Sequence, residues 1–171
     1  DADGQAHSAL SYLYLLERRF DEALAAGRCA VANRPTCAYA NCFYGNVLHY
    51  CGEYERAIHH IRLAIRTQPL HPPFYLHVLA GAHRAKGDFE AALLASKQAV
   101  ELNPSDVASQ VILASAYMGL GAPDMAQEAV AVIQQIEPAF SVTRFMEGQP
   151  YRDAGIATQY VSELRSAGLS A

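Results

Sequence analysis

Apolar and small side chains recur along the chain with a period of about 34 residues, and this period predicts pairs of short helices. A small residue marks one position of the period, where the chain has Ala23, Ala57, Ala92 and Ala126. A large residue marks another, occupied by Leu10, Tyr44, Leu79 and Leu113. Four prolines follow at spacings of 34, 35 and 34 residues, namely Pro35, Pro69, Pro104 and Pro138. A fixed period of this length indicates a solenoid of stacked helix pairs.

Glycine and proline divide each period into two helices. Gly52, Gly87 and Gly121 suit the left-handed residue that ends a first helix, and each proline prevents the second helix from continuing. The small residues let helices cross closely, while the large ones fill the space between them. The pattern predicts eight helices, near 5–17, 21–33, 38–51, 54–67, 73–86, 89–102, 107–120 and 123–136.

The period stops after Pro138, and the remaining residues predict two further helices. Ser141 is placed to cap a short helix that runs to about Glu147. Asp153 is placed to cap a second helix near 154–167, which has a one-sided apolar stripe. This segment either covers the exposed end of the fourth unit or docks in a groove and blocks it, and the pattern leaves both alternatives open.

The repeated positions resemble the tetratricopeptide repeat. The best unit reads Tyr44-Gly45-x-x-Leu48, then Gly52-Glu53-Tyr54-Glu55-Arg56-Ala57-Ile58, then Ala64 and Pro69. The chain departs from the family in lacking tryptophan, in having Arg18 where glycine is usual, and in one extra residue in the turn at 70–73. The resemblance covers about residues 4–138. It implies one all-α domain over 1–171, a right-handed superhelix of four helix-turn-helix repeats, at about 4–37, 38–72, 73–106 and 107–140, with capping helices in 141–171.

In such arrays the first helix of each unit lines a concave groove that holds a peptide or a helix of a partner protein. The resemblance therefore implies a protein-interaction scaffold, with Asn46 suited to contacting peptide backbone and Arg84 to binding a carboxylate. The charged clamp of chaperone-binding arrays is not matched, because its positions hold Ser8, Tyr12, Phe43, Phe74 and Val78. The groove residues carried onto this chain are Tyr12, Tyr39, Phe43, Asn46, His49, Tyr50, His77, Arg84 and Met118, with Phe74 beside them.

Composition and motifs point away from catalysis, cofactors and nucleic acids. The net charge of −4, from 13 basic and 17 acidic side chains, does not suit phosphate binding. The seven histidines show no zinc-binding spacing, and no phosphate-binding loop or nucleophile motif occurs. We therefore expect no metal, no cofactor and no enzymatic activity. The four cysteines form no C-x-x-C pair and are expected to pack between helices, although an oxidising compartment would allow disulfides.

The ends of the chain suggest a larger protein. No apolar run is long enough for a membrane helix and no targeting signal is visible, so a cytoplasmic location is expected. The missing initiator methionine suggests an excised domain. The tail, with Phe140, Arg144-Phe145 and Pro150-Tyr151-Arg152-Asp153, is similar to the end of bacterial proteins that carry a class III nucleotide cyclase or a winged-helix domain. That resemblance implies a C-terminal regulatory module in signal transduction. Two alternatives remain, a self-association module (a homodimer) and a domain that senses a small ligand.

Overall fold

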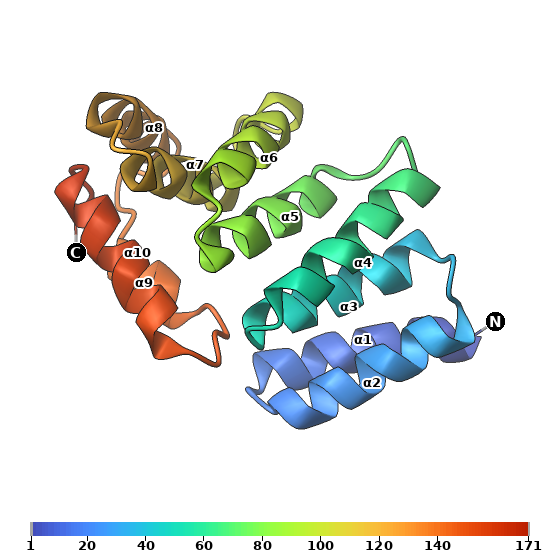
Figure 1. Ribbon diagram of the computed structural model, residues 1–171. Helices are drawn as coiled ribbons and strands as arrows, with labels where there is room; N and C mark the ends of the chain where they lie inside the picture. The colour runs from blue at the N-terminus through green and yellow to red at the C-terminus, as the bar shows by residue number, and fades with distance from the viewer. Residues whose placement is uncertain (1, 171) are drawn as a thin grey trace.

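The computed structural model describes residues 2–170, and within this range every regular element is an α-helix (Figure 1). The all-α superhelix predicted from the period is confirmed. The expected domain limits also include Asp1 and Ala171, which lie outside the described residues. The helices are α1 (Ala2–Leu16), α2 (Phe20–Asn33), α3 (Ala38–Tyr50), α4 (Tyr54–Thr67), α5 (Pro73–Lys86), α6 (Phe89–Leu102), α7 (Val107–Gly119), α8 (Pro123–Ile136), α9 (Val142–Glu147) and α10 (Ala154–Ser166).

The helix pairs α1–α2, α3–α4, α5–α6 and α7–α8 stack in chain order, and we call them units one to four. The bounds of α4, α5, α6 and α8 are those expected from the sequence. Each unit turns where a residue adopts a left-handed conformation. Gly52 has φ +87°, and Arg18 occupies the equivalent place in unit one with φ +58°. A side chain at such φ costs about 1–2 kcal/mol, so Arg18 needs a compensating contact.

Close approach of the helices explains two glycines inside them. A Cβ atom on Gly27 would lie 2.4 Å from the ring of Tyr44, which belongs to the next unit. A Cβ atom on Gly45 would lie 2.5 Å from Ile61 Cγ1, on the other helix of the same unit. The missing side chains therefore allow helices to pack within a unit and between units at a distance that alanine would not tolerate.

The tail is part of the core rather than an appendage. Its side chains Phe140, Val142, Met146, Tyr160 and Leu164 are each 7% exposed or less, and they join the apolar cluster of unit four. Burying a large apolar side chain contributes about 1.5–3 kcal/mol. The tail thus covers the end of the array, and it also lies over part of the concave face, so the two alternatives left open by the sequence do not exclude each other.

The four cysteines are free thiols in this structure, and Cys42 is buried in the core of unit two. Burial raises the pKa of the Cys51 thiol to about 11, which keeps that thiol protonated near neutral pH. Among residues 2–170, no helix combines the length and the apolar character needed to cross a membrane.

Candidate functional site

The concave face of the array is lined by α1, α3, α5 and α7, which pack against one another in that order (Figure 1). The tail divides this face into two regions. The loop at 148–153 and α10 lie over the C-terminal ends of the lining helices, while the N-terminal part of the face stays open. The two regions differ in what their side chains can do.

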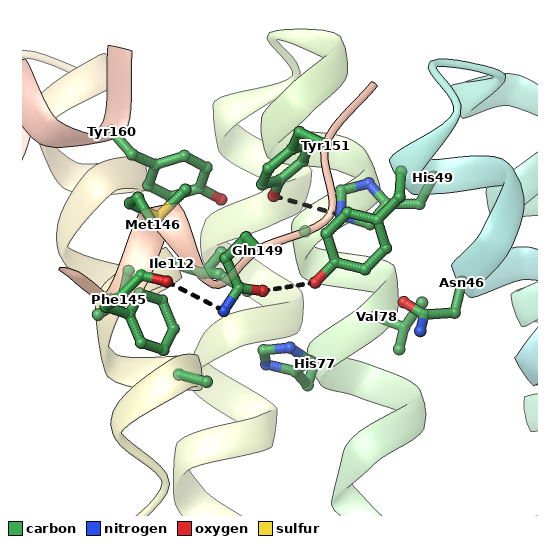
Figure 2. A pocket seen from close by; sticks show the side chains of 14 residues that line it. Asn46, His49, His77, Val78, Ile112, Phe145, Met146, Gln149, Tyr151 and Tyr160 are labelled. Atoms are coloured by element: carbon green, nitrogen blue, oxygen red, sulfur yellow. Dashed lines mark hydrogen bonds between the residues drawn. The ribbon is translucent and has the colours of Figure 1, made fainter. Parts of the chain in front are cut away.

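Polar contacts bind the loop to α3 in the covered region. The Tyr50 hydroxyl donates a hydrogen bond to Gln149 Oε1 at 2.7 Å, and the Arg152 amide donates to the Tyr50 carbonyl at 2.9 Å. The Tyr151 hydroxyl lies 3.4 Å from His49 Nε2, as Figure 2 shows. Two of the expected groove residues, His49 and Tyr50, are therefore occupied by the chain's own tail.

Arg84 is the anchor of α10. Its side chain is fully buried, and Nη2 donates to Glu163 Oε2 at 2.6 Å. Nε donates to Ser115 Oγ at 2.7 Å, and the guanidinium lies 3.6 Å from the centroid of the Tyr160 ring. Ser115 Oγ also donates to Glu163 Oε2 at 2.6 Å. The carboxylate that Arg84 was expected to take from a partner is thus supplied by Glu163.

The tail also reaches back to unit one. Arg18 Nη2 donates to the carbonyl oxygens of Glu147 at 2.9 Å and Gln149 at 3.2 Å, and Arg152 Nη2 lies 3.3 Å from Asp21 Oδ1. Figure 1 shows the loop after α9 beside the turn between α1 and α2. These bonds offset the cost of the left-handed Arg18 backbone, and the tail links the last unit to the first.

A small cavity lies between the loop and the lining helices, with His49, Tyr50 and Gln149 in its wall (Figure 2). It encloses about 20 Å³, which is room for about one water molecule and too little for a peptide side chain. Burial lowers the pKa of His49 to about 3, with His77 and Arg84 adding to the effect, so this imidazole is neutral. This cavity therefore has no room for a partner.

Aromatic rings dominate the open region. The Phe43 ring has its centroid 5.7 Å from that of Tyr12, 4.2 Å from that of Tyr39 and 5.8 Å from that of Phe74. The Phe74 ring stacks on His77 at 6.2 Å. We call Tyr12, Tyr39, Phe43, Phe74 and His77 the aromatic strip. Tyr39 on α3 is 42% exposed and Phe74 on α5 is 36% exposed, so large apolar rings face solvent on two neighbouring helices, and Tyr12 on α1 is half-buried beside them.

His77 at one end of the strip belongs to a polar group that does not have the geometry of a nucleophilic triad. Its Nδ1 lies 3.2 Å from Ser109 Oγ and 3.9 Å from Asp106 Oδ2, while Ser109 Oγ donates to Asp106. A triad needs the two imidazole nitrogens to face different partners. Asp106 also accepts from the Ser109 amide and so caps α7. Among the described residues, no cluster of three His, Cys, Asp or Glu side chains is placed to hold a metal.

The nine expected groove residues therefore separate into groups. Tyr12, Tyr39, Phe43 and His77 form the aromatic strip together with Phe74. His49, Tyr50 and Arg84 lie beneath the tail. Asn46, 4% exposed, lines the cavity between the two regions, and Met118 packs against the apolar cluster of unit four. The sequence prediction named Phe74 only beside the groove residues, although Phe74 in unit three and Tyr39 in unit two occupy the same repeat position at the start of a first helix.

Comparison with known proteins supports the fold. The tetratricopeptide repeat family model matches residues 75–106, which is most of unit three. The solved structure of MamA superposes with a TM-score of 0.69 at 19% identity, covering 96% of this chain and 90% of that one. PilF of Pseudomonas aeruginosa gives 0.73 at 18% identity, with coverages of 100% and 79%.

A third structure, YrrB, is described as a tetratricopeptide repeat protein with an unusual peptide-binding site. It gives a TM-score of 0.64 at 19% identity, covering 94% of this chain and 82% of that one. No curated protein matches the chain. At these identities the likenesses establish the architecture, a superhelix of stacked helix pairs like that of tetratricopeptide-repeat proteins, and leave the function and the partner open.

Proposed function

We propose that this chain is a protein-interaction scaffold that holds an apolar or aromatic-bearing peptide, or a helix, against the aromatic strip. The observation that carries the proposal is the contrast within the concave face. One region is filled by the tail, whereas the other exposes contiguous aromatic rings that no described segment covers. Rings of this kind supply much of the binding energy at protein interfaces.

The geometry restricts how a partner lies. The tail closes the part of the groove formed by the C-terminal ends of the lining helices. A bound segment therefore follows the aromatic strip from α1 to α5 and does not extend toward the loop at 148–153. Beyond Phe74, a cleft lined by Pro72, Phe74 and Asp106 opens beside the strip, with a volume of about 430 Å³. A segment that follows the strip ends at this cleft, where Asp106 favours a basic group.

The proposal extends to the context of the chain. The sequence pattern of the tail supports a role as the C-terminal regulatory module of a larger bacterial protein in the cytoplasm, without enzymatic activity and without nucleic-acid binding. The single tetratricopeptide domain, with its four repeats and C-terminal cap, is the unit that would perform this role. YrrB, whose description mentions a peptide-binding site, supports the peptide-binding part of the proposal.

A phage-displayed random peptide library selected on the immobilised chain tests this function. We expect selected peptides to be rich in apolar and aromatic residues, and Phe43→Ala to weaken their binding at least tenfold, because Phe43 touches three of the other rings. Leu94→Ala, at a 63% exposed position on α6, is the matched control and should bind normally. Selected peptides that bind Phe43→Ala as tightly as the parent chain would refute the proposal.

A further inference from the structure

The cleft at the end of the aromatic strip brings a carboxylate next to a face that is otherwise uncharged. Residues 38–50, 73–83 and 107–119, which form α3, most of α5 and α7, contain no Asp, Glu, Lys or Arg. Asp106 directly precedes α7, and its side chain is 33% exposed. Of the described residues that line the cleft, Asp106 alone is an acidic or basic residue other than histidine. The charge that this cleft offers to a partner is therefore a single negative one.

Only part of the Asp106 carboxylate is used within the chain. Its Oδ2 accepts hydrogen bonds from the amide and the hydroxyl of Ser109 and lies 3.9 Å from His77 Nδ1. Its Oδ1 accepts from no described residue. Burial lowers the pKa of His77 against the opposing effect of Asp106, so the imidazole is neutral near pH 7 and does not balance the carboxylate. Asp106 thus keeps its charge and a free oxygen for a donor from outside the chain.

The backbone around the cleft does not favour an anion, although α5 and α7 both begin there. An anion at a helix N-terminus is held by free amide groups. Pro72 and Pro73 have no amide hydrogen, and the Ser109 amide already donates to Asp106. Residues 98–143 also contain five acidic side chains and no Lys, Arg or His. Charge complementarity therefore favours a cation in the cleft.

We propose, on the basis of the proposed function, that the cleft binds an arginine side chain of the partner, beside the apolar residues that lie on the aromatic strip. A guanidinium group suits the cleft better than an ammonium group, because it is planar and less strongly hydrated. It can donate to Asp106 Oδ1 while its flat face lies against the ring of Phe74, which is 36% exposed. The volume of about 430 Å³ is ample for one such side chain.

Parallel selection of the random peptide library on the parent chain and on Asp106→Asn tests this assignment. Asparagine caps a helix as well as aspartate does, so the variant keeps the cap of α7 and loses the charge. Glu128→Gln, at an exposed position of α8 outside the cleft, removes an equal charge and is the matched control. We expect peptides selected on the parent chain and on Glu128→Gln to carry an arginine beside their apolar residues, and peptides selected on Asp106→Asn to lack this preference.

Calorimetric titration of one selected peptide measures the effect of the charge on affinity. Replacing its arginine by citrulline, which has nearly the same shape and no charge, should weaken binding to the parent chain about fivefold. Replacement by lysine should also weaken it, because the stacking on Phe74 is lost. On Asp106→Asn the arginine and citrulline peptides should bind equally, since both changes remove the same interaction.

Three results would overturn the inference while leaving the proposed function intact. The first is a set of peptides whose binding depends on Phe43 but that show no preference for arginine. The second is an equal loss of affinity in Asp106→Asn and Glu128→Gln, which would indicate a general effect of net charge. The third is equal binding of the arginine and lysine peptides. A selection that yields no peptide dependent on Phe43 would refute the proposed function and the arginine site together.

Discussion

Replacing Glu163 by leucine tests whether the tail is an integral part of the array. The substitution removes the carboxylate 2.6 Å from Arg84 Nη2 and leaves a fully buried guanidinium without a counter-charge. Removing one partner of a buried ion pair typically costs about 3–5 kcal/mol. Glu163 retains some exposure, 17% of its side chain, so we expect a loss near the lower limit, about 3 kcal/mol. For a chain of this length that corresponds to a fall of about 6–12 °C in Tm.

The assay is urea denaturation followed by far-ultraviolet circular dichroism. The matched control is Glu55→Leu, which breaks the surface pair of Glu55 with Lys86 at 3.3 Å and should cost under about 1 kcal/mol. The double variant Arg84→Met with Glu163→Leu should recover most of the lost stability, because it removes both buried charges. If Glu163→Leu and Glu55→Leu lose the same small amount, the tail is not held by Arg84 and the division of the concave face is wrong.

Three further predictions concern other parts of the fold. The pKa of His49 is lowered to about 3, so the unfolded chain binds a proton that the folded chain does not. The contribution of His49 to the free energy of unfolding should be fully present above about pH 6.5 and should fall by up to about 1.4 kcal/mol per pH unit below it. Urea denaturation at pH 7 and pH 5 measures this fall, which should be smaller in His49→Leu. Gly45→Ala should lower stability by about 1–3 kcal/mol in a thermal melt, because its Cβ would overlap Ile61, whereas Gln98→Ala on an exposed position should not. Arg18→Ala, which keeps a side chain at positive φ but loses the bonds to the tail, should increase amide hydrogen exchange in the loop at 148–153, and unchanged exchange would contradict the proposed link to unit one.

The helices could be predicted well because the information that specifies them is local. A small residue such as Ala57 recurs in every unit and a turn glycine such as Gly52 in three of the four, so the copies of one weak pattern support one another. The bounds of α4 and α6 follow from them directly. Position within the array also made the concave face predictable, and Tyr39 and Phe43 lie where the repeat register indicates.

The covered region could not be predicted, because its contacts join residues far apart in the chain. Arg84 and Glu163 are separated by 79 positions, and no periodic pattern relates them. The tail occurs once, so it lacks the repeated pattern from which the helices of the four units could be predicted. Arg18 was visible as a departure from the expected glycine, but its bonds to the carbonyl groups of Glu147 and Gln149 required the structure.

Hydrogen exchange of the chain with and without a selected peptide tests the central claim most directly, that a partner binds the open aromatic strip while the tail stays in place. The account predicts slower exchange in segments 38–45 and 73–78, which contain Tyr39, Phe43 and Phe74, and no change in segment 148–166. Faster exchange of 148–166 on peptide binding would contradict it, because the partner would then displace the tail and occupy the region around Arg84.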